Sequence, residues 1–248
     1  MAKVAITLRS GKTKRVNNFP VASGLVANRT PDVDDAFNIT HIRSGLAVML
    51  EVPDKDLPTT IGVLNQLEWD TTAEEISGSA KHSAVVRELV MDLNKKRSLE
   101  QETKIAADLG GRVQPASGAR WGYRRDVVTP TFLVEAKVTE KGRYSIKGKD
   151  FDHLVEQAYL SGKLGVYIVE LLRTADIVVM KRDDLEGLIG DFECGVSLDN
   201  GVRKNLVVNK DLVKVANEND YVQVKMPEDM LIVMNYGSFI ETIGTKDD

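Results

Sequence analysis

The chain is poor in cysteine, and that shortage limits its chemistry. Cys194 is the single cysteine among 248 residues. One cysteine cannot form an intramolecular disulfide, and it cannot build a metal site based on several cysteines. A lone cysteine also fits a reducing compartment better than a secreted protein.

Long apolar runs are absent as well. No stretch approaches the roughly 18 apolar residues that a membrane-spanning helix needs. Residues 1–8 alternate between polar and apolar side chains as a strand does, and they lack the apolar block and the cleavage site of a signal peptide. We therefore expect an intracellular, cytoplasmic protein that does not associate with membranes.

The chain also lacks an excess of positive charge. Its 33 basic and 37 acidic residues give a formal net charge of −4, so the whole chain does not look like a nucleic-acid binder. The charge is unevenly distributed, however, because residues 112–149 contain nine basic residues against three acidic ones, a formal +6. A local basic patch is typical of a protein that binds phosphate backbones, although a solvated charged face has the same composition.

Apolar periodicity predicts helices and strands between residues 83 and 180. Helices are predicted for residues 83–96, 99–109 and 150–160, since the apolar side chains of each fall on one stripe. Ser98 and Gln101 have the spacing of a capping box, so we expect the second helix to begin there and to end at Gly110 and Gly111. Strands are predicted for residues 132–138, 166–172 and 175–180. This order predicts an α/β core with a mixed central sheet flanked by helices.

The two ends of the chain are predicted to be rich in β-structure. Alternating apolar residues indicate strands between residues 1 and 70, with one short helix near residues 54–67. Toward the C-terminus we expect strands at residues 206–208, 212–215, 221–224 and 230–234.

Two carboxylates and one ammonium group are predicted to meet near residue 135. In a strand over residues 132–138, Glu135 and Lys137 point to the same face. Asp126 precedes two valines and a bend at Thr129 and Pro130 that leads into this strand. Three charges at an apolar sheet edge are costly unless a cation or a phosphate lies between them. We therefore expect a functional site here.

Glu102 is a candidate third acid. On the helix predicted for residues 99–109 it shares a face with Ile105, Ala106 and Leu109. A carboxylate on an apolar helix face is unusual. It fits either a site residue or a boundary glutamate whose carboxylate reaches water.

These residues, taken in order, resemble a known family. Glu102, Ser117-Gly118, Asp126 and Glu135-Ala136-Lys137 are followed by a predicted helix and an apolar strand. The order is similar to that of the PD-(D/E)XK metal-dependent nucleases, in the Holliday junction resolvase branch of archaea and phages. The resemblance covers about residues 98–172. One departure is that Arg125 directly precedes Asp126.

The resemblance implies a fold and a domain organisation. It implies a restriction-endonuclease-like core over residues 76–190, with a β-rich accessory region over residues 1–75 and a β-rich C-terminal region over residues 191–248. It also implies a protein that acts in the cytoplasm, in the host's cytoplasm if a phage encodes it.

The resemblance further implies the chemistry of the site. Asp126, Glu135 and the carbonyl of Ala136 would hold Mg²⁺ or Mn²⁺, and Glu102 would hold the attacking water or a second cation. Lys137 would orient the water or neutralise developing charge, and Ser117 would donate to the scissile phosphate. The implied reaction is endonucleolytic hydrolysis of DNA in recombination or repair, by a homodimer that cuts branched DNA.

Basic side chains near this motif are candidate DNA contacts. Arginines combine with glycines and aromatic residues in residues 117–125, which suits a loop that wraps a backbone phosphate. Trp121 and Tyr123 fit DNA contact or packing of the loop against the core equally well. The candidate DNA-binding residues are Arg112, Arg120, Arg124, Arg125, Lys141, Arg143 and Lys147.

Three alternatives stay open at this point. The same core serves less selective endonucleases of the restriction or DNA-degradation type. A nucleic-acid-binding protein can keep the fold without catalysis. A β-rich assembly protein with an incidental Glu-x-Lys strand would bind no divalent metal.

Overall fold

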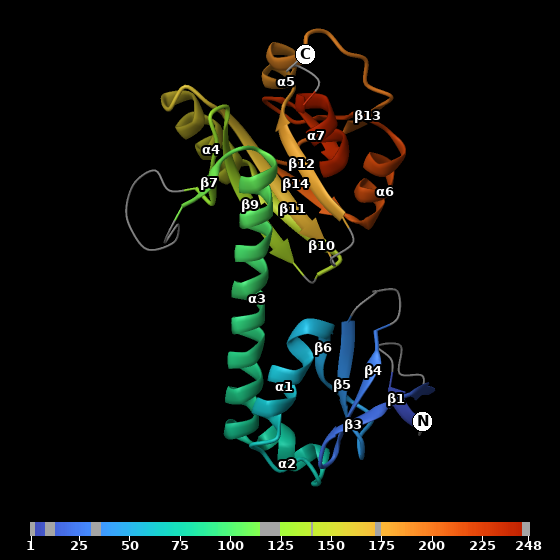
Figure 1. The fold of residues 1–248 in the computed structure, drawn as a ribbon. Coiled ribbons are helices and arrows are strands. Elements are labelled where there is room, and N and C mark those ends of the chain that lie inside the picture. Colours follow the sequence, from blue (N-terminus) through green and yellow to red (C-terminus); the bar gives the residue numbers. More distant parts are fainter. Residues whose placement is uncertain are drawn as a thin grey trace. The chain divides into compact units, whose positions relative to one another are not determined.

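The chain forms two compact units. The structure is a computed structural model that describes residues 3–7, 13–30, 36–114, 125–139, 141–171 and 175–244 (Figure 1). One unit comprises Met1–Lys96 and the other Arg97–Asp248. Helix α3, Ala80–Asp108, supplies its first part to one unit and its last part to the other.

The first unit is built on an antiparallel sheet of order β3-β4-β5-β6, as the alternating apolar pattern predicts. Its core contains the fully buried Leu25, Ile39 and Trp69, and Leu89 of α3 packs against them. The described elements, besides α3, are β1 Lys3–Thr7, β2 Thr13–Asn17, β3 Phe19–Ala22, β4 Leu25–Arg29, β5 Ala36–His41, β6 Ala47–Pro53, the 3-10 helix η1 Asp54–Asp56, α1 Leu57–Leu64 and α2 Ala73–Gly78.

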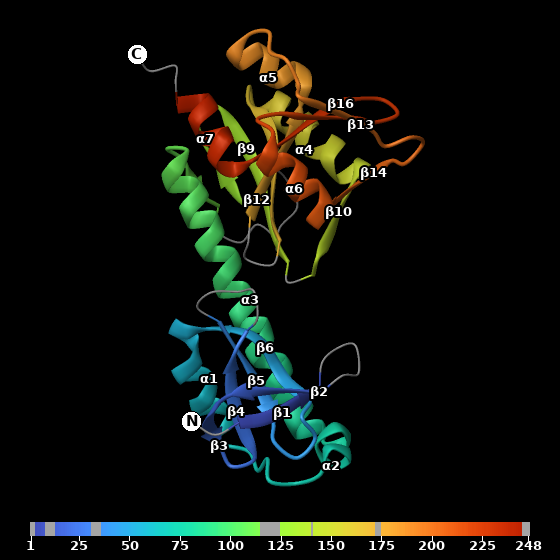
Figure 2. The same cartoon turned by 90° about the vertical axis from the view of Figure 1, so that its right-hand side faces the viewer.

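The second unit contains one large mixed sheet with helices on both faces (Figure 2). Its strands lie in the order β13-β15-β16-β12-β11-β9-β8-β7, in which β9–β11 and β13–β15 are parallel pairs and the others antiparallel. The elements are β7 Arg112–Val113, β8 Val127–Val128, β9 Phe132–Thr139, β10 Arg143–Lys147, α4 Gly148–Leu160, β11 Leu164–Leu171, β12 Ala175–Lys181, α5 Arg182–Ile189, β13 Val196–Asp199, β14 Asn205–Asn209, α6 Lys210–Glu218, β15 Val222–Lys225, β16 Met230–Asn235 and α7 Tyr236–Gly244.

Each face of this sheet has its own apolar core. Helices α4 and α6 and the inner face of the β10–β14 pair cover one face. The end of α3 and helices α5 and α7 cover the other. Strand β11 is apolar on both faces, with Tyr167 and Val169 toward α4 and Val166 and Ile168 toward α3. The α/β class and the mixed sheet flanked by helices are thus confirmed.

The prediction of two helices over residues 83–109 was wrong, because α3 runs unbroken from Ala80 to Asp108. Ser98 does not start a new helix, although it opens a capping-box pattern. No glycine or proline interrupts residues 94–101. A serine inside a helix costs well under 1 kcal/mol, whereas a break would leave several backbone groups at two new ends without partners.

The strand predicted for residues 212–215 was also wrong, since these residues lie in α6. The side chain of Asn209 caps this helix by accepting the N–H of Leu212 at 2.9 Å. Leu212 and Ala216, four residues apart, are buried against the sheet. Helical spacing of buried side chains therefore decides the structure here, over the β-branched valines.

Residues 191–248 add to the central sheet rather than forming a separate sheet of their own. They supply β13, β15 and β16, and β16 pairs directly with β12. The division of the chain into three regions at residues 75 and 190 stays a prediction. Within the described ranges, no helix is both long and apolar enough to cross a membrane.

The packing of α4 predicts a large contrast between two leucines of the same helix. Leu154 is fully buried, whereas Leu160 is 70% exposed. We expect Leu154→Ala to lower the free energy of unfolding by about 2–5 kcal/mol, because it removes buried methyl groups and leaves a cavity. Leu160→Ala is the matched control and should change it by less than about 0.5 kcal/mol. Urea unfolding followed by circular dichroism measures both, and equal effects would contradict this account of the core.

Candidate active site

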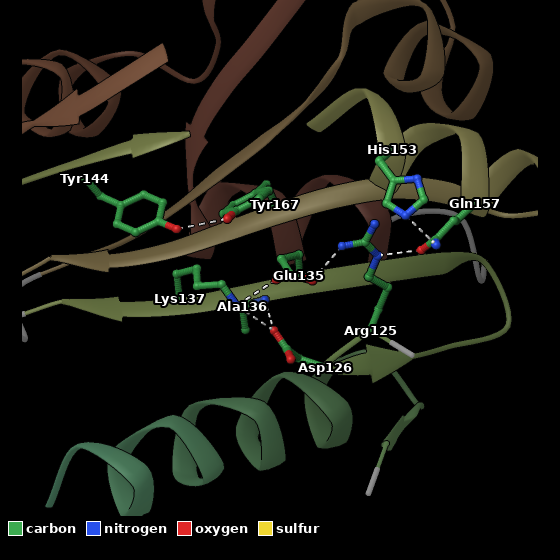
Figure 3. Close-up of polar contacts among 9 residues, drawn as sticks. All are labelled: Arg125, Asp126, Glu135, Ala136, Lys137, Tyr144, His153, Gln157 and Tyr167. Carbon is green, nitrogen blue, oxygen red and sulfur yellow. Dashed lines mark hydrogen bonds and ion pairs between the residues drawn. The ribbon is translucent and has the colours of Figure 1, made fainter. Parts of the chain in front are cut away.

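The candidate site lies where β9 extends past its short neighbour β8. Strand β8 pairs with β9 only at Val127–Val134 and Val128–Leu133, whereas the pairing of β9 with β11 continues to Thr139. Asp126, just before β8, occupies the position where the ladder stops. Its Oδ2 accepts the backbone N–H of Ala136 at 2.9 Å (Figure 3). The carboxylate of Asp126 thus accepts a hydrogen bond that a neighbouring strand would otherwise accept, and this bond holds Asp126 against the edge of β9.

The carbonyl of Ala136 belongs to the same edge. The N–H and the C=O of one strand residue point to the same neighbour. Because the Ala136 N–H points to Asp126, its carbonyl oxygen also faces the side of β9 on which Asp126 lies. The methyl group of Ala136 is buried in the core on the α3 face, so it does not enter the site.

The ammonium of Lys137 lies between the two carboxylates. Its Nζ is 2.7 Å from Glu135 Oε1 and 3.3 Å from Asp126 Oδ2. These two carboxylate oxygens are therefore separated by no more than the sum of the two distances, 6.0 Å. Burial opposes the charged form of Lys137, but the nearby Asp126 and Glu135 carboxylates outweigh it and raise the pKa of Lys137. The predicted meeting of Asp126, Glu135 and Lys137 is present in the structure.

Arg125 holds the other oxygen of Glu135. Arg125 Nη1 is 3.0 Å from Glu135 Oε2, and Arg125 Nε donates to Gln157 Oε1 of α4 at 2.8 Å. The two paired side chains are only 12% and 16% exposed. Gln157 Nε2 in turn lies 2.9 Å from His153 Nε2, at the outer side of α4 (Figure 3). In this structure Arg125, a predicted DNA contact, is a buried partner of Glu135.

Glu102 approaches the same group of charges from α3. Burial raises the pKa of Glu102, and the negative charges of Asp126 and Glu135 add to this effect while Lys137 opposes it. The carboxylate is half-buried. Both interpretations of Glu102, as a site residue or as a boundary glutamate whose carboxylate reaches water, stay predictions.

Two tyrosines border the site on the α4 face. Tyr167 lies opposite Glu135 in the β9–β11 register, and its hydroxyl is 3.1 Å from that of Tyr144 in β10. Burial, the Tyr144 hydroxyl and the charge of Glu135 raise the pKa of Tyr167 well above its ordinary value, so it stays a neutral hydroxyl. No local pattern in the sequence indicates this pair or Gln157, because each contact depends on which strands and helices become neighbours.

The donor atoms at this edge fit a small divalent cation in part. Asp126, Glu135 and the Ala136 carbonyl are hard oxygen donors, the kind that Mg²⁺ prefers, and Mg²⁺ usually keeps several waters. The Lys137 ammonium between the two carboxylates shows that their gap favours a cation. In the part of the chain that the structure describes, no group of three or more His, Cys, Asp or Glu side chains is placed to hold a metal ion. The fit therefore rests on two carboxylates and one carbonyl, with Glu102 farther out.

The remaining predicted residues lie outside this cluster. Ser117, Arg120 and Arg124 fall outside the described residues. Arg112 is exposed on β7, and the other predicted DNA contacts, Lys141, Arg143 and Lys147, are exposed on or beside β10.

The pKa of Glu102 predicts a pH-dependent effect of Glu102→Gln. The folded-state pKa is raised above the ordinary 4.5, so ionised Glu102 costs stability once the pH rises through that window. We expect the metal-free Gln variant to melt at a higher temperature than the wild type at pH 7, and the difference to vanish near pH 4. Thermal unfolding in EDTA measures this. Glu241→Gln, exposed on α7, is the control. A lower melting temperature for Glu102→Gln at pH 7 would show that the repulsion is absent.

The ion pair of Arg125 predicts a stability loss in Arg125→Met, a substitution of similar length. It leaves one oxygen of Glu135 and the Gln157 carbonyl oxygen without their donors, at a cost of about 1–3 kcal/mol. Arg112→Met, at an exposed position, is the control and should cost less than about 0.5 kcal/mol. Urea unfolding measures both. If Arg125→Met is as stable as the wild type, the guanidinium does not hold Glu135.

Comparisons with known proteins add little to this geometry. The sequence matches no protein-family model and no curated protein. A solved structure of Hjc, a Holliday junction resolvase from the archaeal hyperthermophile Archaeoglobus fulgidus, is similar at 15% identity and a TM-score of 0.32, over 46% of this chain and 89% of that one. A likeness this weak carries no argument about activity, so the functional case rests on the site itself.

Proposed function

We propose that this protein is a metal-dependent DNA endonuclease that hydrolyses phosphodiester bonds. The observation that carries the proposal is the meeting of Asp126, Glu135 and Lys137 at an uncovered strand edge, beside the carbonyl of Ala136. Carboxylates that hold a cation, next to an ammonium that stabilises negative charge, suit the hydrolysis of a phosphate diester.

Mg²⁺ or Mn²⁺ held by Asp126, Glu135 and the Ala136 carbonyl would lower the pKa of a bound water and stabilise charge on the phosphate. The chain's own residues supply the rest. Lys137, whose raised pKa keeps it protonated, donates to the attacking water or to a phosphate oxygen. Arg125 and Gln157 keep the carboxylate of Glu135 in one orientation.

Glu102 is the residue suited to accept a proton from the attacking water, because its raised pKa brings it closer to neutrality. The water oxygen bonds to phosphorus, and the bond from phosphorus to the 3′ oxygen breaks. The 3′ oxygen takes up a proton, so the products are a 5′-phosphate and a 3′-hydroxyl.

We further propose that the substrate is branched DNA, as for a Holliday junction resolvase, and that the enzyme acts as a homodimer. The order of Glu102, Asp126 and Glu135–Lys137 along α3, the β8 edge and β9 supports this substrate class. Two opposed strands of a junction must be cut, which requires two sites.

One observation favours a second candidate, a non-catalytic DNA-binding protein. The negative charges of Asp126 and Glu135 are matched by Arg125 and Lys137 without any metal. Ion pairing of this kind also stabilises a fold that has no need of a cation.

Cleavage of a substrate panel separates the two candidates. Four-way junction, flap, duplex, single-stranded DNA and RNA are incubated with the protein, with and without Mg²⁺ or Mn²⁺. We expect metal-dependent cleavage, greatest on the junction, and a loss of about a hundredfold or more in Glu135→Gln with DNA binding kept. Glu241→Gln should cleave like the wild type.

A metal-binding measurement completes this test. We expect calorimetry to detect Mg²⁺ binding by the wild type and weaker binding by Glu135→Gln. If the folded wild type binds DNA but neither binds the metal nor cleaves any member of the panel, the endonuclease proposal is wrong and the non-catalytic reading holds.

A further inference from the structure

Strands β10 and β14 form a two-stranded antiparallel ribbon. The sequence did not indicate that these two strands pair. Arg143 pairs with Asn209, Ser145 with Val207 and Lys147 with Asn205. We use the name basic ribbon for residues 141–149 and 203–210. Its cations are Lys141, Arg143, Lys147, Lys149, Arg203, Lys204 and Lys210.

The two faces of the basic ribbon differ sharply. Tyr144, Ile146, Leu206 and Val208 point inward and belong to the core on the α4 face. The side chains in between are exposed and polar or small. They are Arg143, Ser145, Lys147, Asn205 and Val207. The strands are therefore anchored by their apolar residues while their basic residues face solvent.

The cations of the basic ribbon form no ion pairs within the described part of the chain. Residues 141–149 and 200–210 contain seven cations and no acidic residue. Among the described residues, none of these seven cations forms an ion pair, although the other charged clusters of this unit are paired. On a chain with a net charge of −4, such a patch favours an anionic partner.

Two exposed acids, Asp150 and Asp211, directly follow Lys149 and Lys210 in the sequence, and three more lie on the inner side of the ribbon. Asp152, Glu228 and Asp229 line a cavity of about 180 Å³ together with the inward-facing Ile146 and Leu206. Lys181 pairs with Asp229 at 2.7 Å. Lys149 and Lys204 line the same cavity, and the positive charge of Lys204 opposes the rise in the pKa of Asp152. Arg143 and Lys147 lie on the opposite, outer face of the ribbon, because they alternate with the inward-facing Tyr144 and Ile146.

The cations gather at the two ends of the ribbon. Lys141, Arg143 and Lys210 flank the Arg143–Asn209 pair, and the other four flank the Lys147–Asn205 pair. Arg143 and Lys147 are four positions apart, which at the rise of an antiparallel strand is about 14 Å. Between them lies the neutral pair Ser145 and Val207.

This spacing matches duplex DNA. The major groove of B-form DNA is about 12 Å wide and admits a two-stranded ribbon. Two clusters of cations about 14 Å apart can contact the phosphates on either side of that groove, with small neutral side chains over the base edges. The deep, narrow major groove of an RNA duplex does not admit a ribbon in this way.

The basic ribbon is also close to the candidate active site. Tyr144 of β10 contacts Tyr167, which lies opposite Glu135. Lys137 and Arg143 are six positions apart along the chain, which limits their Cα separation to about 21 Å. At a rise of 3.4 Å per base pair, this span is about six base pairs.

We propose that the basic ribbon binds the phosphate backbones on both sides of a groove of duplex DNA, within about one turn of the phosphate that is cleaved. The position relative to the cleaved phosphate rests on the proposed function, whereas the binding of duplex DNA does not. The ribbon supplies affinity and orientation; it takes no part in the chemistry.

The test is binding of a 30-base-pair duplex in EDTA, followed by fluorescence anisotropy over a range of salt concentrations. Two double variants each remove two cations, Arg143→Gln with Lys147→Gln and Arg203→Gln with Lys204→Gln. Each should flatten the slope of log affinity against log salt by about 2 and weaken binding at 0.1 M salt by up to about 60-fold. Lys214→Gln is the control, because Lys214 is exposed on the neighbouring α6 and pairs with Glu218.

The outcomes separate this proposal from the proposed function. If both double variants keep the wild-type slope and affinity while folding normally, the ribbon proposal is wrong, whatever the protein cleaves. If they lose duplex binding but the wild type cleaves no DNA with metal, the ribbon proposal stands and the endonuclease proposal falls. Equal losses for duplex DNA and for single-stranded DNA or duplex RNA would overturn the groove geometry.

Discussion

The site depends on offsetting the repulsion between two carboxylates at one strand edge. Oxygens of Asp126 and Glu135 lie within 6.0 Å of each other, and at an effective dielectric constant of about 20 two unit charges at that distance repel by about 3 kcal/mol. Lys137 bridges the two, and Arg125 takes the far oxygen of Glu135. Lys137 is two positions from Glu135, whereas Arg125 pairs with Glu135 from ten positions away in the sequence. A divalent cation in the proposed reaction would therefore compete with Lys137 for the same oxygens.

Much of this arrangement could be predicted, because it depends on local patterns. A strand over residues 132–138 puts Glu135 and Lys137 on one face by alternation alone, and the apolar stripe of α4 and the apolar run of β11 identify the two elements that pack beside it. Helical spacing likewise placed Glu102 on the side of α3 that faces the sheet. In each case the regular spacing of residues in a strand or a helix determined which way the side chain points.

The predictions that were wrong concern segments whose structure depends on distant parts of the chain. A capping-box pattern at Ser98 suggested a break, but the continuous α3 keeps more backbone hydrogen bonds. The valines near Leu212 suggested a strand, yet burial of Leu212 and Ala216 against the sheet favours a helix. The burial of Arg125 had no local signal either, because its partner Gln157 is 32 residues away on α4.

Net charge says little about any one part of the surface, since electrostatic effects act over short distances. At physiological salt, exposed charges are largely screened beyond about 8 Å, so a phosphate backbone responds to the cations beside it and not to the sum over 248 residues. In the second unit, the cations of the candidate site and those of the basic ribbon have different surroundings. Arg125 and Lys137 pair with acids inside the site, whereas Arg143 and Lys147 of the basic ribbon are exposed on its outer face and form no ion pair among the described residues. Only the pairing of β10 with β14, across more than fifty residues of sequence, joins two modest basic segments into one surface.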